Sequence, residues 1–576
     1  MTFRWIKSLG LLLALTCAPT VQAQETTQPT RAEVMERVFL TAQSAQTSVA
    51  GKALSQAAAR IAAGSEDLAA LLRERQDTVD GLQVLIDQLA ETAQDSGIAA
   101  ENRVTTLEFA INGARARIKK LDRTLEQDFP EFRELTNPAP LTFAELRSLL
   151  RPDEALLMSF TDQSWTYVWA ISTDGADWHR ADFGDQSLED MVQTLRRQLS
   201  VTEDNRAGKA LKKKSITSSR ASFDRQTAHR IYQKLFQPLG HVFGGASHLM
   251  LVVDGPMTSL PPAVLVTQPP ENGTDPAQSL RDTDWMIRHH ALTTLPTVSA
   301  LRTLRRARPP ERKGAVQPFL GFGDPVLGYR LTADAAAAQD STQDTATDTV
   351  VTRGIYNDVT QVADLAPLPN TSRELRRLAE TMGVGEEALY LSRAATETAV
   401  KQADLSKAEV LAFATHGLLA DGLPGLTEPA LVFTPPDQPS AVDDALLTAS
   451  EAAELKLSAK LVILSACDTA GSDGTPGAEG LSGLARAFIY AGARAILVSH
   501  WPVDDYAASA LTTGMLERMQ GAEDGGENRE EDGDPATRAQ ALRASTLALM
   551  ADPREARFAH PRIWAPFVVV GEGGAD

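Results

Sequence analysis

The chain has 576 residues, of which 56 are lysine or arginine and 75 are aspartate or glutamate, giving a formal net charge of −19. A hydrophobic fraction of 43% and a charged fraction of 23% are typical of a soluble globular protein and exclude a wholly disordered chain. The acidic balance argues against nucleic acid or an anionic membrane as the main partner, because both require a basic face.

The first 23 residues have the pattern of a signal peptide. Two basic residues precede an apolar run over 9–18, and the Val-Gln-Ala of 21–23 is a small–x–small cleavage pattern. The run is too short for a stable membrane-spanning helix, although a retained membrane anchor is the alternative. We expect residues 1–23 to be removed, which leaves a protein exported to a bacterial periplasm or outside the cell, without membrane contact after cleavage.

Removal of the signal peptide also takes away one of the two cysteines and leaves Cys467 alone. A single cysteine in an exported protein cannot form an intramolecular disulfide. Two interpretations of Cys467 remain: a small buried hydrophobe in a strand, or a reactive thiol kept for its chemistry.

Residues 28–135 are predicted to form a helical arm. Apolar residues recur at steps of three and four over 68–89 and again over 104–125, with a polar break at 94–97. So short a break favours an antiparallel helical hairpin with a coiled-coil-like seam. The hairpin is expected either to bind a regulatory protein partner or to pack against the rest of the chain.

The remainder of the chain is predicted to contain two regions. Residues 140–222 form a small β-containing connection, with strands at 155–160 and 165–171 and a flexible basic loop at 201–221. From 223 to 573, continuous apolar runs alternate with helical segments, which predicts a mainly parallel sheet with helices on both faces. We expect strands at 249–253, 319–323, 410–413, 461–464, 495–498 and 567–570, and mobile insertions at 331–361 and 520–537.

Two of these strands end in reactive residues, His416 and Cys467, and sites in open α/β sheets form at the carboxyl ends of strands. An imidazolium beside the thiol favours the thiolate, which is the nucleophile, and His416 would then protonate the leaving amine. The backbone N–H groups of Gly417 and Cys467 are candidates for an oxyanion hole. This set favours peptide cleavage through an acyl-enzyme. It requires no metal or organic cofactor, and no zinc-ligand spacing or dinucleotide fingerprint occurs in the sequence.

Several ordered motifs of the chain resemble those of the CHAT family, caspase-like proteins often joined to tetratricopeptide repeats. The motifs are Ala-Thr-His-Gly at 414–417, Leu-Ser-Ala-Cys-Asp-Thr at 464–469 and Trp-Pro-Val-Asp-Asp at 501–505, with an opening motif over 253–261 and a closing one over 560–567. The resemblance spans roughly 225–573. It implies a caspase-like fold and a cysteine-peptidase dyad, carried over onto His416 and Cys467.

The resemblance also suggests a substrate preference and shows two departures. In separase-like relatives an acidic pocket residue favours arginine before the cut, so Asp468, Asp504 and Asp505 are candidates for recognising Arg or Lys. Their structural alternatives are a turn at Asp468 and a helix cap at Asp504 or Asp505. The usual helical repeats are replaced by the short arm. His500 stands where an apolar residue is more usual, as a second polar group near the site or as an interior histidine.

Two functions therefore follow from the sequence. The first is an exported cysteine endopeptidase acting on a protein substrate through His416 and Cys467. The alternative is a catalytically silent or partner-activated scaffold that uses the same fold to bind protein. Substitution of Cys467 distinguishes the two, because only the peptidase would lose its function.

Overall fold

The computed structural model describes residues 30–45, 98–128, 140–199, 223–306, 316–327, 362–418, 430–465, 483–523 and 536–574, apart from a few positions within these ranges, and some isolated residues between them. The predicted signal peptide 1–23, the basic loop 201–221 and the insertion 331–361 lie outside the described residues. Within the described ranges, no helix is long and apolar enough to span a bilayer.

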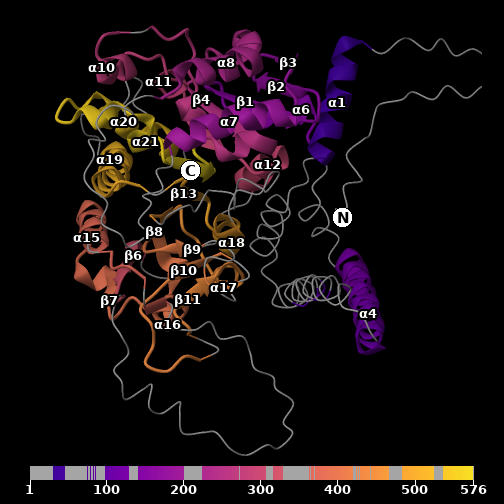
Figure 1. Ribbon diagram of the computed structural model, residues 1–576, viewed down its shortest axis with the longest axis vertical. Helices are drawn as coiled ribbons and strands as arrows, with labels where there is room; N and C mark the ends of the chain where they lie inside the picture. Colours follow the sequence, from indigo (N-terminus) through magenta and orange to yellow (C-terminus); the bar gives the residue numbers. More distant parts are fainter. Residues whose placement is uncertain are drawn as a thin grey trace, which may run out of the picture.

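An eleven-stranded sheet runs through the described part of the protein (Figure 1). In the order in which they lie side by side, its strands are β3 (Ala176–Ala181), β2 (Thr166–Ser172), β1 (Glu154–Thr161), β4 (His248–Val252), β5 (Ala291–Thr294), β14 (Phe567–Gly571), β13 (Ala495–Ser499), β12 (Leu461–Leu464), β8 (Ala408–Ala414), β6 (Gln317–Pro325) and β7 (Leu389–Ser392). A three-stranded sheet consists of β11 (Leu446–Thr448), β10 (Ala430–Val432) and β9 (Gly417–Leu418).

The large sheet contains two parallel blocks, and β2 and β3 are added antiparallel at one edge. Strands β1, β4, β5 and β14 are parallel to one another, as are β13, β12, β8, β6 and β7. The blocks meet at β13 and β14, which pair antiparallel. Strands β1 and β2 pair antiparallel, as a hairpin does, and β1 also pairs with β4, so that both belong to the main sheet.

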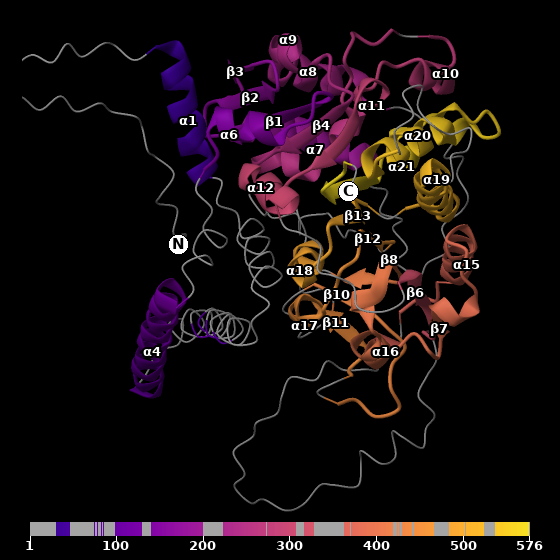
Figure 2. The same cartoon turned by 180° about the vertical axis from the view of Figure 1, so that it is seen from behind.

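Helices cover both faces of the sheet, as the front and back views show (Figures 1 and 2). The helices that contribute to the core on one face are α7 (Asp185–Leu199), α8 (Arg225–Leu235), α15 (Thr371–Thr381), α19 (Asp505–Glu523) and α20 (Arg538–Ala551). Those on the other face are α1 (Arg31–Ala45), α6 (Phe143–Leu149), α12 (Val298–Arg306), α16 (Glu397–Gln402), α17 (Ala449–Glu454) and α18 (Gly483–Ala491).

Shorter turns of helix connect these elements. They are α9 (Gly240–Phe243), α10 (Pro276–Arg281), α11 (Met286–His289) and α21 (Pro561–Trp564), with 3₁₀ turns at Gln237–Leu239, Gly255–Ser259, Pro262–Val264, Glu386–Ala388, Leu405–Lys407 and Ala556–Ala559.

Alternating side chains of the central strands enter the two cores. In β12, Leu461 and Ile463 belong to one apolar cluster, and Val462 and Leu464 belong to the other. Because both faces are buried, such a strand appears in the sequence as a continuous apolar run rather than an alternating one. The predicted α/β class, with a mainly parallel sheet and helices on both faces, is confirmed.

Helix α1, which falls inside the predicted arm 28–135, packs on the body of the protein. Phe39 is fully buried and stacks on Phe143, with ring centroids 4.7 Å apart, and it also contacts Trp169 at 5.8 Å. The Gln43 side chain exchanges two hydrogen bonds of 2.9 Å with the backbone of Leu141. These contacts fix α1 against α6 and β2.

The predicted N-terminal helical region is confirmed over α4 (Ile98–Asp128). Ile111 and Leu121 are buried on this helix, in keeping with the predicted apolar seam, whereas the Phe109 side chain is 82% exposed. Arg117 of α4 forms an ion pair with Glu74, one of the few described residues of the preceding helical segment.

A buried ion cluster joins the start of β1 to the residue after β14. Arg305 of α12 contacts Glu154 at the start of β1, at 2.6 Å, and Glu572 just after β14, at 3.1 Å. His248 of β4 lies 3.5 Å from the Glu154 carboxylate. We call these four residues the Arg305 cluster. Burial alone would raise the pKa of Glu154, but hydrogen bonds from His248 and Arg305 and the Arg305 charge hold it well below its usual value.

Candidate functional site

His416 lies two residues beyond the carboxyl end of β8, and its backbone is held against β10. The Thr415 hydroxyl donates to the Val432 carbonyl, and the Val432 N–H donates to the His416 carbonyl at 3.0 Å. Gly417 then begins β9, which pairs antiparallel with β10. The chain therefore turns from the large sheet into the small one at His416, and both sides of the turn are fixed by hydrogen bonds.

The imidazole of His416 is oriented by a backbone carbonyl. Its Nε2 lies 2.8 Å from the carbonyl oxygen of Ala366, in the segment that leads into α15. Since a carbonyl can only accept, Nε2 carries the proton and donates. In the neutral ring Nδ1 then holds the lone pair, so the contact selects one tautomer and leaves Nδ1 as the basic atom.

The register of the small sheet sets the direction of the Gly417 N–H. The pair formed by Val432 and His416 is hydrogen-bonded, so the next pair, Leu431 and Gly417, is a non-hydrogen-bonded one. Its N–H groups therefore point away from the partner strand. Because β9 is an edge strand of this sheet, the Gly417 N–H points outward from it.

The carboxyl end of β12 is bonded to β8 on one side and to a buried carboxylate on the other. The Ser465 N–H donates to the Phe413 carbonyl at 2.9 Å. The Ser465 hydroxyl lies 3.2 Å from Oε2 of Glu374, which is on α15 and only 7% exposed. Oε1 of the same carboxylate lies 3.4 Å from the hydroxyl of Thr512, on α19. The sequence analysis missed Glu374 and Ala366, because neither belongs to a local motif.

Cys467 and Asp468 lie outside the described residues. What the structure does give is the register of the strands that lead to them: Leu461 to Leu464 of β12 pair with Val410 to Phe413 of β8. Each residue of β12 is thus paired with the residue of β8 that stands 51 positions earlier in the sequence. Cys467 and His416 are also 51 positions apart.

Asp504 is engaged by a helix end and an arginine. Its Oδ1 accepts a hydrogen bond of 3.2 Å from the Ala507 N–H at the start of α19, and its Oδ2 forms an ion pair with Arg557. This is the helix-cap alternative that the sequence left open for Asp504. Asp505 is the first residue of α19.

His500, at the end of β13, is an interior histidine. It is buried beside Trp501, and its backbone carbonyl accepts a 2.8 Å hydrogen bond from Arg196. Its Nδ1 has no hydrogen-bond partner among the described residues. Burial, and then the charge of Arg196, lowers the pKa of His500 to about 3, so the ring is neutral at physiological pH.

The same edge of the sheet carries a strained corner. Asp324 in β6 and Ser392 at the end of β7 have φ values of 55° and 53°, which non-glycine residues rarely adopt. The Ser392 hydroxyl donates to Asp324 at 2.9 Å, and the Thr434 hydroxyl donates to the Ser392 carbonyl at 2.6 Å. Two left-handed residues bonded to each other mark a backbone that its surroundings hold in place.

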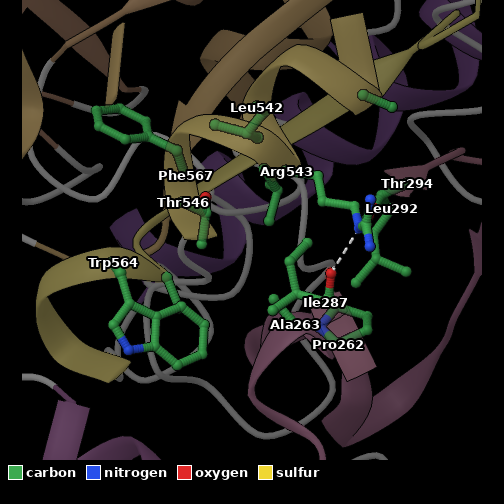
Figure 3. Close-up of a pocket in the computed structure, with 13 residues that line it drawn as sticks. Pro262, Ala263, Ile287, Leu292, Thr294, Leu542, Arg543, Thr546, Trp564 and Phe567 are labelled. Atoms are coloured by element: carbon green, nitrogen blue, oxygen red, sulfur yellow. Dashed lines mark hydrogen bonds between the residues drawn. The ribbon is translucent and has the colours of Figure 1, made fainter. Parts of the chain in front are cut away.

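A small hollow lies in the other block of the sheet, among β5, β14, α20 and α21 (Figure 3). Its lining is mostly apolar, and Arg543 crosses it to donate to the Ile287 carbonyl at 2.9 Å. It contains neither His416 nor a carboxylate, so it offers no acid–base chemistry. Among the described residues there is no group of three potential ligands for a metal ion.

A mainly parallel sheet covered by helices on both faces, with a histidine beyond the carboxyl end of a central strand, defines an α/β protein with its candidate site at the strand ends. Residues 225–572 match the CHAT domain, which is more than half of the chain. The chain belongs to the CHAT family, as its motifs suggested.

Relatives and solved structures share part of this chain. Human tetratricopeptide repeat protein 28 is 22% identical over 433 residues, which are 68% of this chain and 15% of that protein. The mouse protein of the same name is 28% identical over 236 residues, which are 36% of this chain and 9% of that protein. The chain thus spans only a small part of the length of these relatives.

Two crystal structures of the Saccharomyces cerevisiae separase–securin complex are also similar, each over 83% of this chain and 34% of that chain at 10% identity, with TM-scores of 0.41 and 0.36. The fold assignment rests on the sheet topology and not on these scores.

Proposed function

We propose that this protein is a cysteine endopeptidase that uses His416 and Cys467 and an acyl-enzyme intermediate. The observation that carries the proposal is the common offset of 51 residues between β8 and β12 and between the two candidate catalytic residues. In the sequence, Cys467 comes three residues after β12 and His416 two residues after β8, and these two strands are parallel neighbours in the sheet.

The geometry of His416 is suited to the reaction. With Nε2 bonded to the Ala366 carbonyl, Nδ1 takes the thiol proton and the thiolate of Cys467 attacks the scissile carbonyl. The tetrahedral intermediate collapses to a thioester as the imidazolium returns the proton to the leaving amine, and water then hydrolyses the thioester. The outward N–H of Gly417, together with that of Cys467, is proposed to stabilise the oxyanion.

The substrate is proposed to be a protein cut after Arg or Lys. Recognition of a guanidinium or ammonium group requires a carboxylate that is not already neutralised. Asp504 caps α19 and pairs with Arg557, so Asp468 and Asp505 remain the better candidates. Export to a periplasm or to the outside of the cell, after removal of residues 1–23, is part of the same proposal.

A labelling experiment tests the proposed function. The mature protein is incubated with a Lys/Arg-directed acyl-reactive peptide probe, and the adduct is mapped by mass spectrometry. The peptidase predicts an adduct on Cys467 that disappears in His416→Ala, whereas His289→Ala, which removes an imidazole outside the site, still reacts. If a folded protein with reduced Cys467 gives no adduct, the proposal is wrong.

A second function is favoured by the surface of α4. The 82% exposed Phe109 is a large apolar side chain on a helix of the predicted arm. Aromatic side chains of this kind are typical anchors of protein interfaces. We therefore propose, as the alternative, a scaffold or a latent peptidase activated by a protein partner at this helix. Phe109→Ser would abolish partner binding in that case, without changing the labelling of Cys467 in the isolated protein.

A further inference from the structure

One short segment contacts the ends of both strands that lead to the candidate dyad. The Ala366 carbonyl accepts from Nε2 of His416, beyond β8, and the Glu374 carboxylate accepts from Ser465, beyond β12. Only eight positions separate these two contacts in the sequence. The segment from Ala366 to Glu374 therefore lies across the ends of two adjacent parallel strands.

Helix α15 is anchored by its packing in the core. Leu375 and Leu378 are buried in the core beneath the sheet, and the helix packs on β6, β8 and α19. Figure 1 shows α15 beside β6 and next to α19. Glu374 lies in the first turn of this helix, where the helix dipole favours a negative charge.

The Glu374 carboxylate is buried between hydroxyl groups of two other elements. The Ser465 hydroxyl, just beyond β12, donates to Oε2 of the carboxylate. The Thr512 hydroxyl, on α19, lies 3.4 Å from Oε1 and shares its single proton with the Ala508 carbonyl, 2.9 Å away. A buried carboxylate is costly unless it is hydrogen-bonded, so the fold holds these hydroxyl groups in place to satisfy it. Because its hydroxyl is bonded to Glu374, the Ser465 side chain is fixed at the end of β12.

We propose that Glu374 is a positioning residue that locks the end of β12 in register with the end of β8. Ser465 is bonded to β8 through its backbone N–H and to Glu374 through its hydroxyl, so its backbone and its side chain are both held at the end of β12. The Ala366 carbonyl, before α15, thereby orients the imidazole of His416, and Glu374, on α15, holds the strand that leads to the thiol. This inference rests on the proposed function, because it concerns the alignment of that dyad.

Glu374→Gln is the sharpest perturbation. Glutamine has the same shape but no charge, so its hydrogen bond from Ser465 loses the strength that the carboxylate charge gives it. Misalignment of reacting groups by about 1 Å costs roughly 100-fold in rate. We expect labelling of Cys467 by the Lys/Arg-directed peptide probe to slow by at least about tenfold.

The test compares four variants of the mature protein, including the double variant Glu374→Gln/Ser465→Ala, by two readouts. Glu374→Gln and Ser465→Ala remove the two ends of the contact, and Glu380→Gln removes an exposed carboxylate of the same helix as the matched control. The first readout is the rate of peptide labelling. The second is the pH dependence of Cys467 alkylation by iodoacetamide, whose midpoint rises when His416 no longer stabilises the thiolate. Thermal unfolding of every variant is measured alongside.

We expect Glu374→Gln and Ser465→Ala each to slow labelling and to raise the pH midpoint of alkylation. The double variant should be no slower than either single variant. Glu380→Gln should match the wild type. Wild-type rates and midpoints in both variants would overturn the inference while leaving the proposed function intact. Slower labelling that follows loss of folding, with an unchanged midpoint, would also overturn it. An unreactive Cys467 in the wild type would refute the proposed function, and this inference with it.

Discussion

Replacing Arg305 by methionine should destabilise the protein strongly and in a pH-dependent way. Arg305 makes ion pairs with two carboxylates, Glu154 and Glu572, which are only 1% and 2% exposed. Methionine keeps much of the side-chain volume but leaves both carboxylates buried without this cation. Breaking a buried ion pair by removing one partner costs about 3–5 kcal/mol, and we expect a loss of that size at pH 7.5.

The pH dependence follows from the pKa of Glu154. In the wild type this pKa is depressed, so the contribution of Glu154 to stability is complete above the unfolded value of about 4.3 and is lost as the pH falls below it. In Arg305→Met burial remains and the main cation is gone, so the pKa of Glu154 is expected to rise above the unfolded value. The cost of its charge then diminishes as the pH falls, and the difference between variant and wild type narrows from pH 7.5 to 5.

Equilibrium unfolding in urea, followed by tryptophan fluorescence, measures this difference without adding salt that would screen the charges. Arg376→Met is the matched control, because Arg376 pairs with Glu386 at the surface, with side chains 49% and 68% exposed. An exposed pair is worth at most about 1 kcal/mol. A loss in Arg305→Met no larger than that of the control, or a loss that stays constant on acidification, would refute the reasoning.

Three further predictions concern other parts of the fold. Phe39→Ala should cost about 3–5 kcal/mol in the local stability of α1, seen as faster amide hydrogen exchange over 31–45 with β12 unaffected. His500→Phe should flatten the fall in Tm between pH 7 and 5. The unfolded imidazole binds a proton below about 6.5 that the buried one, with a pKa of about 3, does not bind, so the wild type loses stability as the pH falls. Asp504→Ala should lower stability by about 1 kcal/mol in urea unfolding, whereas Asp504→Asn keeps a capping oxygen and should lose less; equal losses would contradict the cap.

The central strands could be predicted from the sequence because burial on both faces leaves an unmistakable apolar run. The predicted strands 410–413 and 461–464 correspond to β8 and β12 within a few residues. Strands β5 (Ala291–Thr294) and β7 (Leu389–Ser392) are short and partly polar, and they were missed. The pairing of β1 with β4 joins residues more than 90 positions apart, and no local pattern encodes so distant a contact.

The candidate site, like the sheet, could be predicted from the sequence only where a local motif marks a residue. His416 stands out because a histidine followed by glycine ends an apolar strand, and its place beyond β8 is confirmed. Glu374 carries no such signal, since a glutamate on an amphipathic helix is usually a solvent-facing residue. Its burial depends on Ser465 and Thr512, which lie 91 and 138 positions away and reach it only in the folded protein.

The position of β14 has a consequence for the order of assembly. This strand is the last of the described strands in the sequence, yet it lies between β5 and β13, where the two parallel blocks meet. Until β14 is in place, the edges of β5 and β13 that it joins have no partner strand. Open edges of apolar strands invite pairing with other chains. We therefore expect a truncation before residue 567 to leave two blocks with open edges that are prone to aggregation, rather than one shortened protein.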